Sequence, residues 1–366
     1  MKENSGFCFF DKVNKNRGFQ PISAHLSLTY FCNLDCIHCY CKGSEDKKKE
    51  LDTRRWFEII DDIKKQGCIY LIFSGGESLI RKDFLEIYNY AKKSGFLITI
   101  FTNGLLLKGK ILGHLARSAP YSIDITLNGI TQKTYESITQ KKGSFSEVIR
   151  NIKEVNKKNI PLRIKSNFLK QNKDEIAGIK AFVEEALGTG RAKFHFAYDP
   201  VIHPRLNGDK TPCDFRLDFR EMEEARCGDS EIWQQYQREL HGRIPELSRN
   251  NKSLLYLCRS WMRQFFIDPY GILRFCALSD KFDVDLKTSS IKGGLAQTFS
   301  KIKDARFRTD SKCRDCSLRL ICYNCPARAY LETCDEEAPV EYYCELAKAT
   351  QEEMHFAIAK RGVSAP

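Results

Sequence analysis

Residues 29–39 read Thr-Tyr-Phe-Cys-Asn-Leu-Asp-Cys-Ile-His-Cys and set Cys32, Cys36 and Cys39 in a Cys-x3-Cys-x2-Cys spacing. Three thiols on one short loop form a set of soft metal ligands that lacks a fourth member. A closed structural metal site has four protein ligands, whereas a reactive site keeps one coordination position open for a small molecule. This spacing therefore predicts a reactive metal centre near the start of the chain.

The cysteine loop follows a short apolar stretch at residues 24–28, which predicts a buried strand that ends where the loop begins. After a charged linker at residues 41–50, Asp52 and Thr53 can cap a helix that Gly67 ends. The apolar positions of this helix, which recur at the spacing of one helical face, are Trp56, Ile59, Ile60 and Ile63.

The same strand and helix unit repeats through the first 200 residues. We expect strands at 24–28, 69–73, 96–101, 121–127, 162–167 and 192–196, with further helices at 81–94, 146–158 and 174–187. Such alternation predicts parallel strands joined by crossover helices. Periodicity alone fits a partial barrel or a doubly wound sheet. The placement of the cysteine loop, Gly75, Asn103 and residues 126–128 at carboxyl ends of strands favours the mouth of an α/β partial (β/α)6 barrel.

Composition and charge limit the class of protein. The chain has 366 residues with 42% apolar content, which is enough for a large core and more than one domain. The net charge of +12 comes from lysines scattered over the whole length, such as residues 47–49, and no segment combines basic residues with aromatic platforms. We therefore expect no nucleic-acid partner.

No apolar run is long enough for a membrane span, and residues 1–20 lack a secretory pattern, so we expect a cytoplasmic protein.

The chain holds sixteen cysteines in two main groups, one at 32–39 and the other at 258–344. Because the chain is long and lacks an export signal, metal binding is a better interpretation than disulfides. The cysteines outside these patterns are expected to be small buried hydrophobes; they are Cys8, Cys41, Cys68, Cys213, Cys227 and Cys334.

Two motifs support an iron-sulfur centre at the first group. Three thiolates can hold three irons of a four-iron cluster and leave the fourth iron exposed. A zinc site with His38 as fourth ligand is the alternative, but His38 adjoins Cys39 and has poor geometry for the same ion. Gly75 and Gly76 after an apolar strand let backbone groups approach a ligand, and Glu77 offers a carboxylate to an ammonium group.

With these motifs together, the chain resembles the radical S-adenosylmethionine (radical SAM) superfamily over its first 200 residues. The resemblance implies that a SAM-binding 4Fe–4S cluster cleaves SAM reductively to methionine and a 5'-deoxyadenosyl radical. It implies these roles: Cys32, Cys36 and Cys39 as cluster ligands, His38 behind the adenine, Gly75, Gly76 and Glu77 at the methionyl amino group, and Asn103 and Thr126 as polar SAM contacts. Turn capping is the alternative role for Asn103 and Thr126. Ser78 stands where the family usually has proline, which removes a rigid turn but no ligand.

The second cysteine group resembles the SPASM extension of radical SAM maturases, which carries two auxiliary 4Fe–4S clusters. By this resemblance Cys313, Cys316, Cys322 and Cys344 hold one cluster, and Cys258, Cys276 and Cys325 hold the other, nearer the barrel. The fullest version of the family has another cysteine shortly before the Cys258 position, where this chain has residues 252–257 without one. The inner cluster is therefore expected to have an open iron or a non-cysteine ligand. A structural zinc module is the alternative, because paired Cys-x2-Cys segments are typical of zinc ribbons.

These expectations divide the chain into an N-terminal extension at 1–23, the barrel at 24–200, a linker at 201–257, a small SPASM domain with little regular structure at 258–350 and a tail at 351–366. The residues after the sixth strand, Tyr198 to Asn207, could line the barrel mouth, with Asp199, His203 or Arg205 touching substrate. A proline-stiffened surface linker is the equal alternative for this segment.

The resemblance implies oxidative maturation of a ribosomally made peptide, with thioether or carbon-carbon crosslinks both possible. It further implies an electron donor such as flavodoxin or ferredoxin. About twenty residues precede the first strand, too few for a winged-helix leader-binding domain, so a separate recognition protein is expected. A sulfatase-maturating (formylglycine-generating) enzyme is the first alternative, although Ala277 stands where that family has aspartate and only Asp280 and Asp283 lie near. A tetrapyrrole-modifying enzyme, favoured by the basic charge, comes next. Outside enzymes, an iron-sulfur electron carrier or a zinc-stabilised interaction module stays open.

Overall fold

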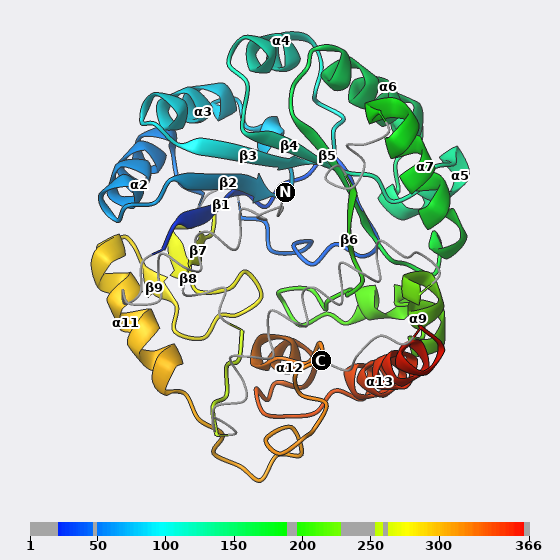
Figure 1. The fold of residues 1–366 in the computed structure, drawn as a ribbon. Coiled ribbons are helices and arrows are strands. Elements are labelled where there is room, and N and C mark those ends of the chain that lie inside the picture. Colours follow the sequence, from blue (N-terminus) through cyan, green and yellow to red (C-terminus); the bar gives the residue numbers. More distant parts are fainter. Residues whose placement is uncertain (1–20, 47–49, 189–195, 228–252, 259–262, 362–366) are drawn as a thin grey trace.

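The computed structural model describes residues 21–46, 50–188, 196–227, 253–258 and 263–361. Its centre is a curved sheet whose first six strands follow one another in chain order (Figure 1). They are β1 (Ser23–Thr29), β2 (Tyr70–Gly75), β3 (Leu97–Thr102), β4 (Ser122–Thr126), β5 (Leu162–Asn167) and β6 (Phe196–Asp199). All five pairings between them are parallel. A doubly wound sheet reverses its strand order at a switch point, and this one does not, so the partial barrel is confirmed.

The helices between these strands lie on the outer side of the curved sheet (Figure 1). They are α2 (Thr53–Lys65), α3 (Phe84–Lys93), α4 (Gly109–Arg117), α5 (Gln132–Thr139), α6 (Ser144–Lys157) and α7 (Ile176–Leu187). Helix α2 shows why they form: the Asp52 side chain accepts a hydrogen bond from the Arg55 amide, and Trp56, Ile59, Ile60 and Ile63 are buried. The core therefore lies between the sheet and its helices.

The element boundaries differ from the sequence-based ones in three places. Most of the sixth strand predicted at 192–196 lies outside the described residues, and strand β6 runs on to Asp199, so Tyr198 and Asp199 belong to the strand. Helices α4 and α5 were not predicted, because both are short and bury few apolar side chains; α4 buries only Leu112 and Leu115. Within the linker expected at 201–257, the structure has a helix, α9 (Phe219–Cys227).

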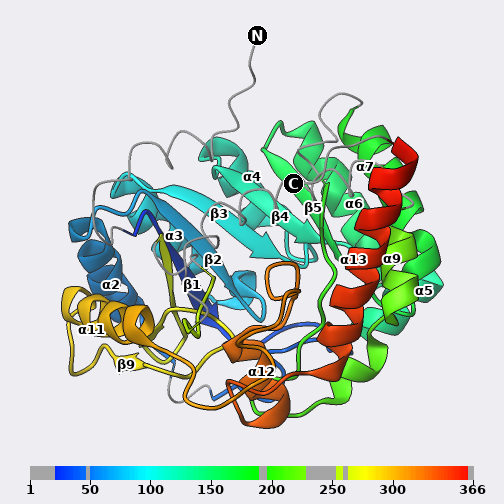
Figure 2. The same cartoon turned by 60° about the horizontal axis from the view of Figure 1, so that its bottom comes forward.

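The C-terminal region has more regular structure than the sequence predicted. It contains β7 (Gln264–Ile267), β8 (Ile272–Arg274), β9 (Val284–Asp285), α11 (Ile291–Asp304), α12 (Pro326–Thr333) and α13 (Glu341–Arg361). Strand β7 pairs in parallel with β1, and β8 and β9 extend the same sheet. Helix α13 crosses the division expected at residue 350 and lies beside α9 (Figure 2). The region is therefore joined to the barrel at the β1 edge and again through α9.

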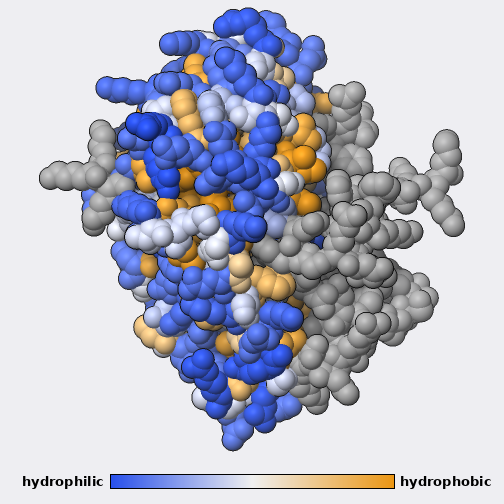
Figure 3. Space-filling model, turned by 90° about the vertical axis from the view of Figure 1, so that its left-hand side faces the viewer, coloured by the Kyte–Doolittle hydropathy of each residue, from blue (hydrophilic) through white to orange (hydrophobic). Residues whose placement is uncertain are grey.

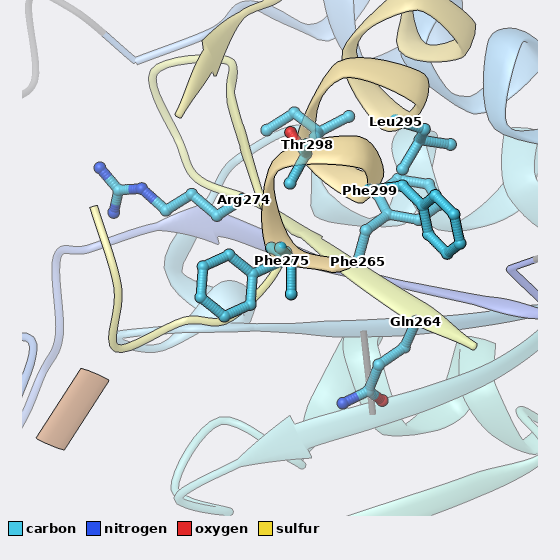
Figure 4. Close-up of a pocket in the computed structure, with 9 residues that line it drawn as sticks. Gln264, Phe265, Arg274, Phe275, Leu295, Thr298 and Phe299 are labelled. Atoms are coloured by element: carbon cyan, nitrogen blue, oxygen red, sulfur yellow. The ribbon is translucent and has the colours of Figure 1, made fainter. Parts of the chain in front are cut away.

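Two further features of the structure are one face of its surface and one small pocket. The face that carries α2 and α11 is mostly hydrophilic, with scattered apolar side chains between the charges (Figure 3). A small pocket between α11 and strands β7 and β8 is lined mainly by apolar side chains such as Phe265, Phe275 and Leu295 (Figure 4). None of the cysteines predicted as ligands lines it. Within the described ranges, no helix has the length and apolar character that a membrane crossing requires.

Candidate functional site

The cysteine loop leaves the carboxyl end of β1 and rests on helix α5. The backbone amides of Asp35 and Ile37 donate to the carbonyls of Thr139 and Ile138, over 3.2 and 3.0 Å. The Lys141 ammonium donates to the carbonyl of Asn33 over 3.0 Å. Helix α5 therefore fixes the shape of the loop, a role that the weak periodicity of this helix did not reveal.

The loop cysteines influence one another's pKa values, which indicates that their side chains lie close together. Burial raises the pKa of Cys32 to about 11, and the negative charges of Glu77 and Cys39 add to this effect. Burial likewise raises the pKa of Cys36, with Cys39 and Cys32 as the next causes. The pKa of Cys39 is lowered to about 7, chiefly by a hydrogen bond from the Cys41 thiol. Metal ligation requires thiolates, so a bound cation would supply the charge that makes all three ionise.

The Gly75–Glu77 turn is docked directly against the start of the cysteine loop. The amide of Gly76 donates to the carbonyl of Thr29, and the amide of Glu77 donates to the carbonyl of Phe31, both over 2.8 Å. A Cβ atom on Gly75 would lie 1.9 Å from the Thr29 oxygen, and one on Gly76 would lie 2.4 Å from the oxygens of Tyr30 and Phe31. Only glycine fits at either position, so the two motifs form one unit.

The Glu77 side chain is turned into the protein and has no exposed area. Its carboxylate accepts hydrogen bonds from the amides of Leu79 and Asn103 and from the Thr102 hydroxyl, at 3.0, 2.8 and 2.9 Å. Burial raises the pKa of Glu77, and these hydrogen bonds oppose the rise. The sequence suggested that this carboxylate meets an ammonium group, whereas the structure uses it to join the turn to the end of β3.

Asn103 lies beside the first cysteine of the loop. Its side-chain amide donates to the Asn33 side chain over 2.7 Å and approaches the Cys32 sulfur at 3.7 Å. The Asn103 side-chain oxygen also accepts from the Leu105 amide, as a turn-capping residue does. The structure thus brings Cys32, Asn103 and Glu77 together at one corner of the barrel mouth.

His38 lies in a second polar corner, at the ends of β4 and β5. The side-chain amide of the buried residue Asn128 donates to His38 Nε2 over 3.2 Å, and its oxygen accepts from the Asn167 amide over 2.8 Å. Burial lowers the pKa of His38 to about 4, so the imidazole is neutral. Thr126 is half-buried at the end of β4, opposite Lys165 in register. Asn128, which follows β4 in an Asn-Gly pair, is the residue that contacts His38, and the sequence analysis did not single it out.

The outer cysteine set is brought together as the sequence predicted. Burial is the largest cause that raises the pKa of Cys322, to about 12. The charges of Cys344, Cys313 and Cys316 raise this pKa as well. The backbone amide of Asn324 points at the Cys322 sulfur over 3.3 Å, and its side-chain amide points at the Cys313 sulfur over 3.5 Å. Four thiols with amide donors around them match the surroundings of a complete cluster.

The inner set consists of three cysteines that also act on one another. Burial raises the pKa of Cys276 to about 12, and the charges of Cys325 and Cys258 contribute next. Cys325 stands at the N-cap of α12, and Cys276 follows β8 closely. The cysteines outside the three sets were expected to be buried. Cys41 and Cys68 are buried, Cys213 is half-buried, and Cys334 is exposed, contrary to that expectation. Cys8 lies outside the described residues.

The three residues predicted to touch substrate after the sixth strand, Asp199, His203 and Arg205, have different surroundings in the structure. Arg205 is paired with Asp209, with 2.5 Å between their side chains, and lies near the loop that follows Cys39. The Asp199 carboxylate accepts from the Val201 amide over 3.0 Å, and the surrounding protein raises its pKa although solvent reaches the residue. Burial lowers the pKa of His203 well below its usual range, and the charge of Arg328 is the next cause. The charge of Arg328, which the sequence did not single out, thus acts on both Asp199 and His203.

The donor sets fit the iron-sulfur clusters that the resemblance implies. Within the described ranges, no three Cys, His, Asp or Glu side chains converge as the ligands of one metal ion do. In a four-iron cluster each thiolate binds a different iron, so its ligands surround a volume rather than a point. Cysteines 32, 36 and 39 form a set of three, and within each C-terminal set the cysteines act on one another electrostatically, while their role as cluster ligands stays a prediction.

Known proteins resemble the chain in sequence. Residues 26–183 match the model of the radical SAM superfamily. The AdoMet-dependent heme synthase of Methanosarcina barkeri is 27% identical over 338 residues, which cover 87% of this chain and 94% of that protein. The sporulation killing factor maturation protein SkfB of Bacillus subtilis is 26% identical over 56% of this chain, and the match spans 48% of SkfB, less than two thirds of its length.

A solved structure resembles the whole arrangement. The crystal structure of Streptococcus suis SuiB bound to the precursor peptide SuiA superposes with a TM-score of 0.67 and 19% identity. The superposition covers 92% of this chain and 80% of SuiB, and it shows that the barrel and the C-terminal cysteine-rich region together form one known fold. Residues 26–183, which carry the docked cysteine loop and glycine turn at the barrel mouth, form a radical SAM domain, and the chain is a radical SAM enzyme related to peptide maturases and to heme synthase.

Proposed function

We propose that this enzyme oxidatively modifies a ribosomally made peptide, forming a thioether or carbon-carbon crosslink, in the cytoplasm. The observation that carries the proposal is the docking of the glycine turn on the cysteine loop, together with the pairing of the cysteine-rich region with the same sheet. The amides of Gly76 and Glu77 donate to carbonyls at the start of the loop, and strand β7 pairs with β1, which leads into that loop. This arrangement supports a radical-forming site and an electron acceptor within one fold.

The chain's own residues would hold the cofactors at the first site. A 4Fe–4S cluster with bound SAM supplies a 5'-deoxyadenosyl radical when an external reductant such as flavodoxin or ferredoxin delivers an electron. Cys32, Cys36 and Cys39 would ligate that cluster, and the backbone of Gly75 and Gly76 would receive the methionyl amino group. The neutral His38 ring would lie behind the adenine. Asn103 and Thr126 would contact SAM from the ends of β3 and β4.

The C-terminal cysteines would complete the electron balance. Crosslinking removes two hydrogens from the substrate: the adenosyl radical takes one as an atom, and the other leaves as a proton and an electron. Cys258, Cys276 and Cys325 would hold the inner auxiliary cluster, which would supply an electron acceptor, while Cys313, Cys316, Cys322 and Cys344 would hold the outer one. We propose that Asp199 takes the proton, because the surrounding protein raises the pKa of its carboxyl group.

The inner set has three cysteines, which leaves one iron without a cysteine ligand. We propose that a substrate thiolate binds there, which would place sulfur beside the carbon radical. A magnetic signal of the reduced inner cluster that changes on addition of a cysteine-containing peptide would support this assignment. An unchanged signal would leave the position to a water or another protein ligand.

A tetrapyrrole substrate is the second candidate, because the heme synthase match spans nearly the full length of that protein. The basic net charge of +12 also suits a substrate with several carboxylates. A sulfatase-maturating activity has less support, since Ala277 follows Cys276, while the nearby Asp283 is paired with Arg274 over 2.9 Å.

The test begins with anaerobic purification and measurement of iron, zinc and 5'-deoxyadenosine. We expect iron for three clusters and release of 5'-deoxyadenosine from SAM under reduction. Zinc without iron, or iron without this product, would refute the assignment as a radical SAM enzyme. The protein is then given either a short cysteine-containing peptide encoded beside its gene, with any separate recognition protein, or iron-coproporphyrin III. Loss of two hydrogens from the peptide, measured by mass spectrometry, supports maturation. Conversion of the porphyrin with an unchanged peptide would replace it by the second candidate.

A further inference from the structure

Arg328 occupies an unfavourable place in its own helix. Helix α12 begins at Pro326, and Cys325 is its N-cap residue, so Arg328 is the third residue of the first turn. The amino end of a helix carries a partial positive charge, so a cation there is unfavourable. The position is therefore explained by something other than helix stability.

The guanidinium of Arg328 is held without a carboxylate partner. Its Nη1 donates to the Tyr323 carbonyl over 2.6 Å, while its Nε is buried and has no hydrogen-bond partner among the described residues. No Asp or Glu of the described ranges forms an ion pair with it. The buried residue Arg216 shows the usual arrangement: it is paired with Glu332 at 2.6 Å and also donates to the Ile202 carbonyl at 2.7 and 2.9 Å.

Two parts of the chain act electrostatically on Arg328. Burial lowers its pKa, but Cys325, Tyr343, Asp199 and Cys276, in decreasing order of effect, raise it overall. Two of these four are inner-set cysteines, and Asp199 ends strand β6. Arg328 lies in the first turn of α12, three residues after its N-cap Cys325, so it is a partly buried cation close in the chain to an inner-set cysteine.

We propose that Arg328 sets the reduction potential of the inner auxiliary cluster, with Asp199 acting in the opposite direction. Reduction adds a negative charge to the cluster, and a fixed cation in a poorly solvated environment stabilises the reduced form. Arg328 thus makes the inner cluster a better electron acceptor, and the Asp199 carboxylate reduces this effect. The inference rests on the proposed function only in that an inner cluster is present.

The experiment measures the midpoint potentials of both auxiliary clusters in the full-length, cluster-loaded protein by redox titration followed by electron paramagnetic resonance. Addition of SAM identifies the signal of the first cluster, and a Cys276→Ala variant identifies the inner one. The test variants are Arg328→Gln, which keeps a donor toward Tyr323, Arg328→Lys, which keeps the charge, and Asp199→Asn. Arg319→Gln is the matched control, because Cys313 and Cys316 of the outer set are the first charges that stabilise Arg319.

Arg328→Gln is expected to lower the inner midpoint, Arg328→Lys to restore most of it, and Asp199→Asn to raise it. Arg319→Gln should move the outer midpoint and leave the inner one unchanged. Equal iron content in the Arg328, Asp199 and Arg319 variants shows that their clusters are intact. An unmoved inner midpoint in Arg328→Gln, or the same shift in Arg328→Lys, would overturn the inference while the proposed function stands. Iron for only one auxiliary cluster in the unaltered protein would overturn both.

Discussion

At the scale of single residues, Glu77 shows how burial changes the role that a motif suggests. A carboxylate beside two glycines offers itself to an ammonium ligand in the linear sequence. In the folded chain it has no exposed area and receives three hydrogen bonds from β3 and the turn. The side chain therefore acts on a ligand through the backbone that it holds in place.

Replacing Glu77 with Gln should destabilise the protein and weaken SAM binding. The Gln amide group has one acceptor oxygen in place of two, so at least one buried donor loses its partner, at about 1–3 kcal/mol. Denaturant unfolding and equilibrium SAM binding measure the two effects. Glu86→Gln, on the exposed side of α3, is the control and should change neither. Equal unfolding midpoints for both variants would show that the three hydrogen bonds contribute nothing to stability.

At the scale of elements, the barrel mouth depends on how closely two loops approach. The glycine turn contacts the cysteine loop through backbone atoms alone, and helix α5 supports that loop from the other side. Neither contact involves the side chains that carry the motifs. The spacing of cysteines selects the ligands, and these backbone contacts hold them in position.

Gly76→Ala should prevent assembly of the first cluster. Its new methyl group would lie 2.4 Å from two carbonyl oxygens of the loop, and backbone cannot give way as a flexible side chain does. Gly113→Ala, within α4, is the matched control: the nearest atom would be the Arg117 side chain at 3.8 Å, and alanine should stabilise the helix by up to about 1 kcal/mol. Iron content and 5'-deoxyadenosine formation are measured for both. Normal SAM cleavage by Gly76→Ala would contradict the docking.

At the scale of the whole molecule, the C-terminal region closes onto the barrel at two separated places. Strand β7 pairs with β1, the strand that leads into the cysteine loop, and α13 packs on α9 near the other edge. Residues more than 200 positions apart thus share one sheet. The two groups of cysteines are nevertheless held by different elements.

Because different elements hold them, the cysteine groups should assemble independently. Replacing Cys32, Cys36 and Cys39 together by Ala should abolish SAM cleavage and leave the auxiliary iron in place. Iron analysis and the absorption spectrum of the anaerobic protein decide this, with the Cys334→Ala variant as control because this exposed cysteine belongs to neither group. Loss of all iron from the triple variant would mean that the sites depend on one another.

The local sequence by itself determined the parallel strands and most of their bounds, and it singled out three cysteine sets whose role as cluster ligands stays a prediction. Apolar periodicity reports burial on one face, and ligand spacing reports chemistry, and both are readable over short distances. It missed α4 and α5, whose stability comes from contacts with the rest of the barrel rather than from a strong apolar pattern.

Only the tertiary structure decided what distant residues do together. It turned Glu77 inward, placed Asn128 against His38, and exposed Arg328 to the charges of Asp199 and the inner cysteines. These roles arise from hydrogen bonds and charges between segments that are far apart in the chain. Such interactions act only after the barrel has closed around them, so no pattern along the sequence carries their signal.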